Sequence, residues 1–339
     1  MIFRNSMYIR SKIIFLYLLK FGGIFLLAKF FNRNKLRILC YHGISLEDEH
    51  KFIPSNFIKF TTLQKKVQWL RKSNYTIISL EQAIKALNNK QNLRNCVVIT
   101  FDDGFESILE EAFPWFIKEN IPVTLYLTSY YAQNRGPIFR LAVQYLCWKS
   151  TPQKIQLGKY TLETKSDDSI WKFINNCEKQ LTHKQRNDLL NAIQDKLNIK
   201  LSLQILKSLS IISAEKIKEL DQNHIDIQLH THRHLFPADD EIATKELQDN
   251  IEFLKRHTNS SLKHFCYPSG IWSPKNFQTL EKFHIASATT CEPGLVKKDD
   301  HLLALPRIIE SQKMSLIQFQ AEILGIGDAL RNLIKRLKT

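Results

Sequence analysis

Two neighbouring carboxylates at the end of an apolar run are the first residues in this chain that could do chemistry. The run is residues 97–101, and Asp102, Asp103 and Gly104 follow it directly. Buried parallel strands end at the sheet edge where α/β enzymes bind ligands, and two carboxylates side by side there repel unless they share a metal ion or a proton. A plain turn is the simpler alternative, because Asp-Gly is a common turn dipeptide. The pair alone leaves both interpretations open.

A second cluster far downstream favours a metal site. Residues 226–234 run from a short apolar stretch into three histidines. Carboxylate and imidazole bind a zinc-like ion at roughly 2.0–2.2 Å, with three protein ligands in a catalytic site. We assign His230, His234 and one aspartate of the pair as those ligands. An extended chain would hold positions i and i+4 about 13 Å apart, so we expect a coil just after His230 and expect His232 to point elsewhere.

Five segments together resemble the polysaccharide deacetylase family, also called the NodB-homology family or carbohydrate esterase family 4. The carboxylate motif at 100–104 and the His-Thr-x-x-His motif at 230–234 are the most specific in combination. Residues 39–44 are similar to the family's opening strand, 265–270 to its third motif and 305–308 to a strand near the end of the domain. The resemblance covers about residues 36–312.

The resemblance implies a role for each residue of the two main motifs. Asp102 would be the catalytic base, and Asp103, His230 and His234 would hold a divalent metal ion, which we expect to be Zn²⁺. The implied reaction is hydrolysis of the acetamide of an N-acetylated sugar, which gives acetate and a free amine. A base in this reaction must reach the water's proton without binding the metal.

The third motif and the end of the domain supply further candidates. A backbone N–H after Tyr267 could hold the developing oxyanion, although Pro268 has no N–H to donate. Arg307 would orient an active-site carboxylate, because a guanidinium stays charged and is a poor proton donor. Many family members carry a Leu-x-His motif that protonates the leaving amine, and no such triplet follows Tyr267. His301 has charged neighbours typical of an exposed loop, so the general acid stays unassigned.

Composition limits the classes of partner. The formal net charge is +15, yet the lysines are scattered and no nucleic-acid motif appears, which favours an anionic lipid surface over nucleic acid. The six cysteines lack metal-binding or framework spacing, which is typical of free thiols in a reducing compartment. We therefore expect a protein on the cytoplasmic face of the inner membrane.

Both ends of the chain are candidates for membrane contact. The apolar stretch 13–28 contains Lys20, which costs about 2.5–3.5 kcal/mol at a bilayer centre and largely offsets the apolar gain, so insertion is close to neutral. We predict that 1–35 is a membrane-associating segment with a helix lying in the interface; a single span and a helix packed on the domain are the alternatives. We predict that residues 313–339 form a C-terminal basic helix, which either contacts the membrane or is solvated.

Between these ends, strands and helices alternate. We predict strands at 36–41, 96–101, 123–127 and 225–229 and helices at 61–72, 107–119 and from Ser213. This alternation indicates an α/β fold with a mostly parallel sheet. The resemblance implies that it closes into an irregular (β/α) barrel spanning 36–312, and about 131–212 reads as a mostly helical insertion.

The combined prediction is a metal-dependent hydrolase that removes the N-acetyl group from an N-acetylhexosamine in a glycan or a lipid-linked sugar. An O-acetyl esterase or another amide deacylase on the same site is the nearest alternative. A catalytically silent glycan-binding protein is the non-enzymatic alternative, although a degenerate copy tends to lose its metal ligands. Two histidines and a carboxylate also suit an Fe(II) oxygenase, but a separate Asp102 poised as a base favours hydrolysis.

Overall fold

The computed structural model describes residues 2–220 and 223–336, and the side chains of that part of the chain from residue 11 onward. Seven parallel strands form its central sheet. They are β1 (Arg37–Tyr41), β5 (Cys96–Phe101), β6 (Val123–Leu127), β9 (Ile225–Leu229), β10 (His264–Cys266), β11 (Ser287–Pro293) and β12 (Leu305–Ile309).

The seven strands close into a barrel. The hydrogen-bonded order is β1-β12-β11-β10-β9-β6-β5, and β5 pairs back onto β1 from Arg37 opposite Val97 to Tyr41 opposite Phe101. Closure removes the free sheet edges that would otherwise need protection. The ring is irregular, because the register of β11 against β12 shifts and β4 (Thr76–Ile77) adds an eighth strand beside the start of β5. The predicted irregular (β/α) barrel is confirmed.

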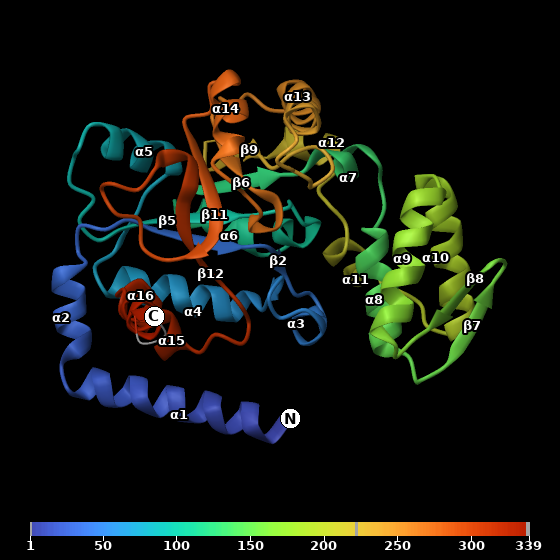
Figure 1. Cartoon of the computed structure of the whole chain (residues 1–339), viewed down its shortest axis with the longest axis horizontal. Coiled ribbons are helices and arrows are strands. Elements are labelled where there is room, and N and C mark those ends of the chain that lie inside the picture. The colour runs from blue at the N-terminus through green and yellow to red at the C-terminus, as the bar shows by residue number, and fades with distance from the viewer. Residues whose placement is uncertain (1, 221–222, 337–339) are drawn as a thin grey trace.

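Helices cover the outside of the barrel (Figure 1). They are α4 (Phe60–Lys72), α5 (Leu80–Asn88), α6 (Ala112–Lys118), α12 (Ala214–Glu219), α13 (Asp240–Lys255), α14 (Lys275–Lys282) and α15 (Leu316–Ile323). The connections contain shorter pieces, namely β2 (Gly43–Ile44), α3 (Glu49–Phe52), β3 (Phe57–Ile58), η1 (Glu106–Leu109), α7 (Ser129–Gln133), η2 (Pro268–Gly270) and η3 (Leu302–Ala304). Because both faces of the barrel strands are covered, β1 and β6 are buried at every position.

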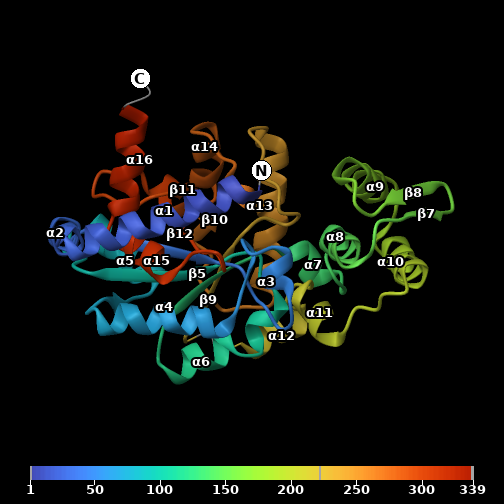
Figure 2. The same ribbon diagram turned by 90° about the horizontal axis from the view of Figure 1, so that it is seen from below.

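The long connection between β6 and β9 forms a separate lobe beside the barrel (Figures 1 and 2). It holds α8 (Phe139–Lys149), β7 (Lys154–Leu157), β8 (Tyr160–Glu163), α9 (Asp167–Gln180), α10 (His183–Leu197) and α11 (Leu203–Ser208). The mostly helical character matches the expectation for 131–212. The antiparallel hairpin β7–β8, which turns at Gly158 with φ 58°, was not predicted.

One predicted helix is wrong in its first half. Residues 107–119 do not form a single helix, because a 3₁₀ turn (η1) ends at Leu109 and α6 begins at Ala112. Pro114 lies in the first turn of α6, which is where a helix tolerates the missing N–H and which favours a new start there over a continuous helix.

The N-terminal segment is a bent pair of helices, α1 (Ile2–Phe21) and α2 (Ile24–Phe31), joined through Gly23 with φ 79°. Within the described chain, no single helix is long and apolar enough to cross a bilayer. Residues Ser11–Phe21 and Ile24–Phe31 reach that threshold only as a pair, and the two are bent by 77°. Leu16 and Phe25 pack with Ile317 of α15 and Ile326 of α16 (Ile326–Arg336) in a small apolar cluster. One side of the helix pair is therefore packed on the domain.

Candidate active site

The two carboxylates at the end of β5 face different partners. Asp103 adopts a left-handed backbone conformation with φ 67°, and Gly104 follows with φ 92°. A Cβ on Gly104 would lie 2.1 Å from Leu127 Cδ1, so only glycine fits this turn. The turn sends Asp103 towards the histidines after β9 and leaves Asp102 against Arg307. The repulsion expected from the sequence is resolved by two separate partners.

The chain coils directly after His230 and brings three candidate ligands together. Thr231 and His234 have φ values of 63° and 58°, which fold the segment back on itself. Nε2 of His230 and Nε2 of His234 each lie 3.2 Å from Oδ1 of Asp103. His232 turns away, and its Nδ1 is 2.9 Å from the hydroxyl of Ser129.

Hydrogen bonds with Cys266 and Asn250 fix the orientation of His230. Its Nδ1 lies 2.8 Å from the carbonyl of Cys266, and its amide donates to Asn250 Oδ1 at 3.1 Å. Asn250 in turn donates to the carbonyl of Leu127 at 3.1 Å. Because Nδ1–H donates to a carbonyl, the lone pair of Nε2 points to Asp103, which is the usual arrangement of a metal-binding histidine.

The three side chains fit a zinc-like ion. Bonds of about 2.1 Å at the tetrahedral angle place neighbouring ligand atoms about 3.4 Å apart, and Asp103 Oδ1 lies 3.2 Å from both imidazole nitrogens. All three ligand atoms lie within 4.8 Å of one another. The His230 side chain is 2% exposed and that of His234 is 34% exposed, so the cluster opens to solvent on one side. A catalytic metal site has this arrangement, with protein ligands on one side of the metal and an open position for substrate on the other.

Asp102 forms a buried bidentate ion pair with Arg307. Nη1 of Arg307 donates to Oδ1 at 2.8 Å and Nη2 donates to Oδ2 at 2.7 Å. The guanidinium is held by Thr290, whose carbonyl accepts from Nε at 2.8 Å. Burial raises the pKa of Asp102, but the charge of Arg307 outweighs burial and holds this pKa far below its usual range. Asp102 is therefore an ionised carboxylate beside the candidate metal site, and Arg307 lies where it can orient it.

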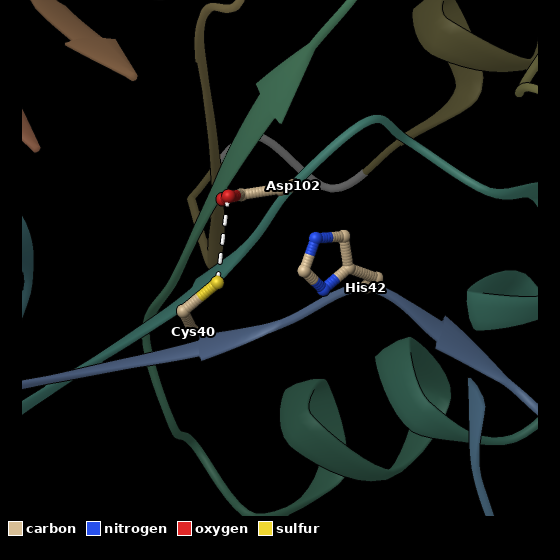
Figure 3. A group of neighbouring side chains, drawn as sticks. All are labelled: Cys40, His42 and Asp102. Atoms are coloured by element: carbon tan, nitrogen blue, oxygen red, sulfur yellow. Dashed lines mark hydrogen bonds between the residues drawn. The ribbon is translucent and has the colours of Figure 1, made fainter. Parts of the chain in front are cut away.

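Two thiols and an imidazole complete the surroundings of Asp102. The Sγ atoms of Cys40 and Cys266 lie 3.4 and 3.3 Å from its Oδ2. His42 follows β1, and Figure 3 shows its ring beside the Asp102 carboxylate. Ligand atoms of Cys40, His42 and Asp102 all lie within 4.8 Å of one another, and His42 Nδ1 is buried without a hydrogen-bond partner among the described residues.

His42 is the site residue that the sequence analysis missed. It was treated only as part of the opening strand, although it follows the predicted strand 36–41 just as Asp102 follows β5. Applying the same strand-end argument to β1 would have identified it. The structure places it at the same end of the barrel as Asp102 and Asp103, where an imidazole can exchange a proton with a ligand.

Tyr267 and His301, the candidates with weaker sequence support, lie at structural or surface positions. The side chain of Tyr267 is buried, and its hydroxyl donates to the carbonyl of Leu303 at 3.0 Å. Its amide already donates to the carbonyl of Thr289 at 3.1 Å, and Pro268 has none. An oxyanion donor in this loop must therefore come from residue 269 or beyond. His301 is exposed and stacks on Phe277 at a ring-centroid distance of 4.3 Å, as expected for a surface position.

Comparison with known proteins decides the family. The model of the polysaccharide deacetylase family matches residues 89–287, more than half of the chain. The chain belongs to this family. The match includes Asp102, Asp103, His230, His234 and the strands from β5 to β10. The resemblance inferred from the motifs is confirmed, and the protein is a hydrolase of the polysaccharide deacetylase class.

Relatives of the deacetylase family match over most of their length. YxkH of Bacillus subtilis (strain 168) is 21% identical over 292 residues, covering 85% of this chain and 76% of that protein. The poly-beta-1,6-N-acetyl-D-glucosamine N-deacetylase of Staphylococcus epidermidis is 20% identical over 292 residues, covering 83% and 81%.

Solved structures share the fold. The deacetylase PplD of Streptococcus pyogenes, in complex with acetate, superimposes with a TM-score of 0.58 at 18% identity over 85% of this chain and 98% of its own. IcaB from Ammonifex degensii gives 0.56 at 18% identity over 86% and 98%. At these identities the superpositions establish the barrel and do not identify a substrate.

Proposed function

We propose that this polysaccharide deacetylase removes the acetyl group from an N-acetylhexosamine in a glycan or a lipid-linked sugar, with one divalent ion, Zn²⁺, held by Asp103, His230 and His234. The observation that carries the proposal is the arrangement of the two aspartates. One lies 3.2 Å from two imidazoles, and the other, Asp102, is ionised beside them without belonging to that set. Hydrolysis needs both a metal site and a separate base.

The chain's own residues divide the remaining work. A divalent ion bound there supplies Lewis acidity for activating water and polarising a carbonyl. Asp102 accepts the proton of the attacking water, and Arg307 keeps its carboxylate ionised and oriented. His42 donates a proton to the leaving nitrogen, because its imidazole lies next to Asp102 at the same end of the barrel. The similarity to an N-deacetylase of poly-beta-1,6-N-acetyl-D-glucosamine supports an N-acetylated sugar as substrate.

Acetate release and metal content together test this proposal. Purified protein is assayed on N-acetylated oligosaccharides and lipid-linked sugars, with and without a chelator. Asp103→Asn is expected to lose metal, whereas Asp102→Asn keeps the metal and loses about 10²- to 10⁴-fold in turnover. Asp168→Asn, an exposed aspartate of the lobe, is the control that changes neither. Full metal content in Asp103→Asn, or full turnover in Asp102→Asn, contradicts the assignment.

The leaving group tests the proposed role of His42. His42→Gln is expected to lower turnover of an N-acetyl sugar by about 10²-fold or more, because the departing amine must be protonated. Turnover of an aryl acetate ester, whose phenolate leaves without being protonated, should fall far less. Equal losses on both substrates would show that His42 acts by holding Asp102 in place.

The same assays separate the alternatives. An esterase would release acetate from O-acetyl sugars and leave N-acetyl sugars intact. A silent glycan-binding protein would bind oligosaccharide and release no acetate with any metal. An iron oxygenase using Asp103, His230 and His234 would require oxygen, so anaerobic turnover excludes it.

The proposed location is the cytoplasmic face of the inner membrane, with an anionic lipid surface as partner. All six cysteines are free in the structure, and Cys40 and Cys266 both touch Asp102 Oδ2, where oxidation would disturb the site. A reducing compartment protects them. Labelling of intact cells with a membrane-impermeant thiol or amine reagent tests this location, and strong labelling from outside would place the domain on the outer face.

A further inference from the structure

Exposed apolar side chains are concentrated on α1 and α2. Of the nineteen large hydrophobic residues that are exposed among those described, ten lie within residues 14–31. The most exposed are Phe21 at 86%, Leu26 at 75% and Phe31 at 75%. Contiguous apolar surface of this kind marks an interaction site in a soluble domain.

The exposed faces are held in a fixed position. Leu16 and Phe25 are buried against the C-terminal helices, and Lys20 Nζ donates to Gln320 Oε1 at 3.1 Å. Lys29 Nζ donates to the carbonyl of Ser73 at 2.7 Å. Both helices are therefore anchored to the domain by one side while the other side stays exposed.

A cavity of about 410 Å³ lies between α1, α15 and α16, which run close together in Figure 2. Its apolar lining comes from Phe15, Leu16, Ala321, Leu330 and Ile334. This volume falls in the range of ligand pockets, about 300–1,000 Å³. Phe15 and Ile334 are themselves 46% and 51% exposed, so the cavity is continuous with the exposed apolar surface of α1.

The charge around this cavity selects an anion. Residues 1–46 contain eight lysines and arginines and no aspartate or glutamate. Lys12 and Arg331 line the cavity. Arg331 is already paired with Glu322, whose carboxylate accepts from both Nη atoms at 3.0 and 2.9 Å. Lys12 has no acidic partner among residues 11–220 and 223–336, which leaves its charge available to a ligand.

We propose that this cavity binds one fatty acyl chain of an anionic phospholipid, with the headgroup phosphate beside Lys12, while α1 and α2 rest on the bilayer. The combination of an apolar cavity, a cation at its edge and flanking apolar helix faces matches a chain joined to an anionic headgroup. A second copy of the protein fits poorly, because α1 and α2 carry five lysines and arginines and no acidic residue, so a two-fold contact through these helices would bring like charges together. The proposal deepens the membrane association proposed above.

Binding of a soluble single-chain lipid tests the cavity without a bilayer and without catalysis. Lysophosphatidylglycerol, below its micelle concentration, is titrated into the full-length protein by calorimetry. We expect one lysolipid per chain. Ala321→Trp, which fills the cavity from the 3% exposed Ala321, should weaken binding by about tenfold or more. Lys12→Glu should weaken the binding of lysophosphatidylglycerol and leave the binding of lysophosphatidylcholine unchanged.

Matched controls keep the result interpretable. Leu203→Ser removes an apolar side chain that is 74% exposed in the lobe, and Lys298→Glu reverses an exposed charge elsewhere, so neither should alter lysolipid binding. Deacetylation of a soluble oligosaccharide is measured in parallel, so loss of activity with intact lipid binding refutes only the catalytic proposal. Equal lysolipid binding by wild type, Ala321→Trp and Lys12→Glu overturns the cavity assignment. A dimer that blocks lysolipid binding overturns it in favour of a second copy.

Discussion

The ion pair between Asp102 and Arg307 makes the sharpest quantitative prediction. Arg307→Met removes the guanidinium and leaves a carboxylate that is 3% exposed without a counter-charge. Breaking a buried pair from one side costs about 3–5 kcal/mol. An unfolding entropy of about 2.1 cal/mol/K per residue over 339 residues turns this into a fall in Tm of about 4–7 °C.

The double variant isolates the charge pairing. Asp102→Asn with Arg307→Met removes both charges, so the combined loss in free energy of unfolding should be smaller than the sum of the single losses by about 2 kcal/mol. Arg37→Met is the matched control, because Arg37 is equally buried and its guanidinium donates to backbone carbonyls, among them that of Ile323 at 2.9 Å. Its effect should add to that of Asp102→Asn within about 0.5 kcal/mol.

Chemical unfolding monitored by circular dichroism measures these losses, and the pH dependence of turnover gives a second readout. With Arg307 gone, the largest effect that opposes burial is lost and the pKa of Asp102 rises, so the acid limb of the rate profile should move to higher pH. Simple additivity of Asp102→Asn and Arg307→Met, together with an unmoved acid limb, would refute the reasoning.

Three further predictions concern the support of the barrel. Burial raises the pKa of Asp226 from 3.8 to about 6, so the stability that this residue contributes is present at low pH and is lost as the pH rises to about 6. Asp226→Asn should remove this pH dependence and stabilise the protein at pH 7 by up to about 3 kcal/mol. Denaturant titrations at several pH values measure the effect. Gly104→Ala should lower expression and metal content, since its Cβ would meet Leu127 at 2.1 Å; normal metal content would contradict the tight turn. Asn250→Ala should weaken metal binding about 10- to 100-fold in competition with a chelating dye, because Asn250 accepts the amide hydrogen bond of His230.

Four of the seven barrel strands, β1, β5, β6 and β9, were predictable because buried parallel strands are rich in apolar residues, whereas β11 was not predicted. The predicted strands at 96–101, 123–127 and 225–229 coincide with β5, β6 and β9. The hairpin β7–β8 was missed because its residues Lys154–Leu157 alternate exposed and buried inside a segment of strong helical signals. Hydrophobic periodicity could not predict closure of the ring either, since closure depends on β1 pairing with strands that are far away in the sequence.

The candidate ligands were predictable from residue type and spacing, and the structure brings Asp103, His230 and His234 together. Their roles stay predictions until metal content is measured. The bond between Arg307 and Asp102 joins positions 205 residues apart, so no local pattern could reveal its bidentate geometry. His42 directly follows the predicted strand 36–41, but it was missed because a single histidine without a second metal-binding residue beside it carries little signal.

Ring closure has a consequence for synthesis of the chain on the ribosome. Strand β1 is complete at Tyr41, but β12, which pairs with one of its edges, begins only at Leu305. At about 5–20 residues per second, the nascent chain carries that open edge for roughly 13–53 s. Leu16 of α1 waits even longer for Ile317 of α15. During this interval an apolar helix and an unpaired strand are both available to a chaperone, a bilayer or another nascent chain, so translation of β12 and α15 decides when β1 and α1 become inaccessible.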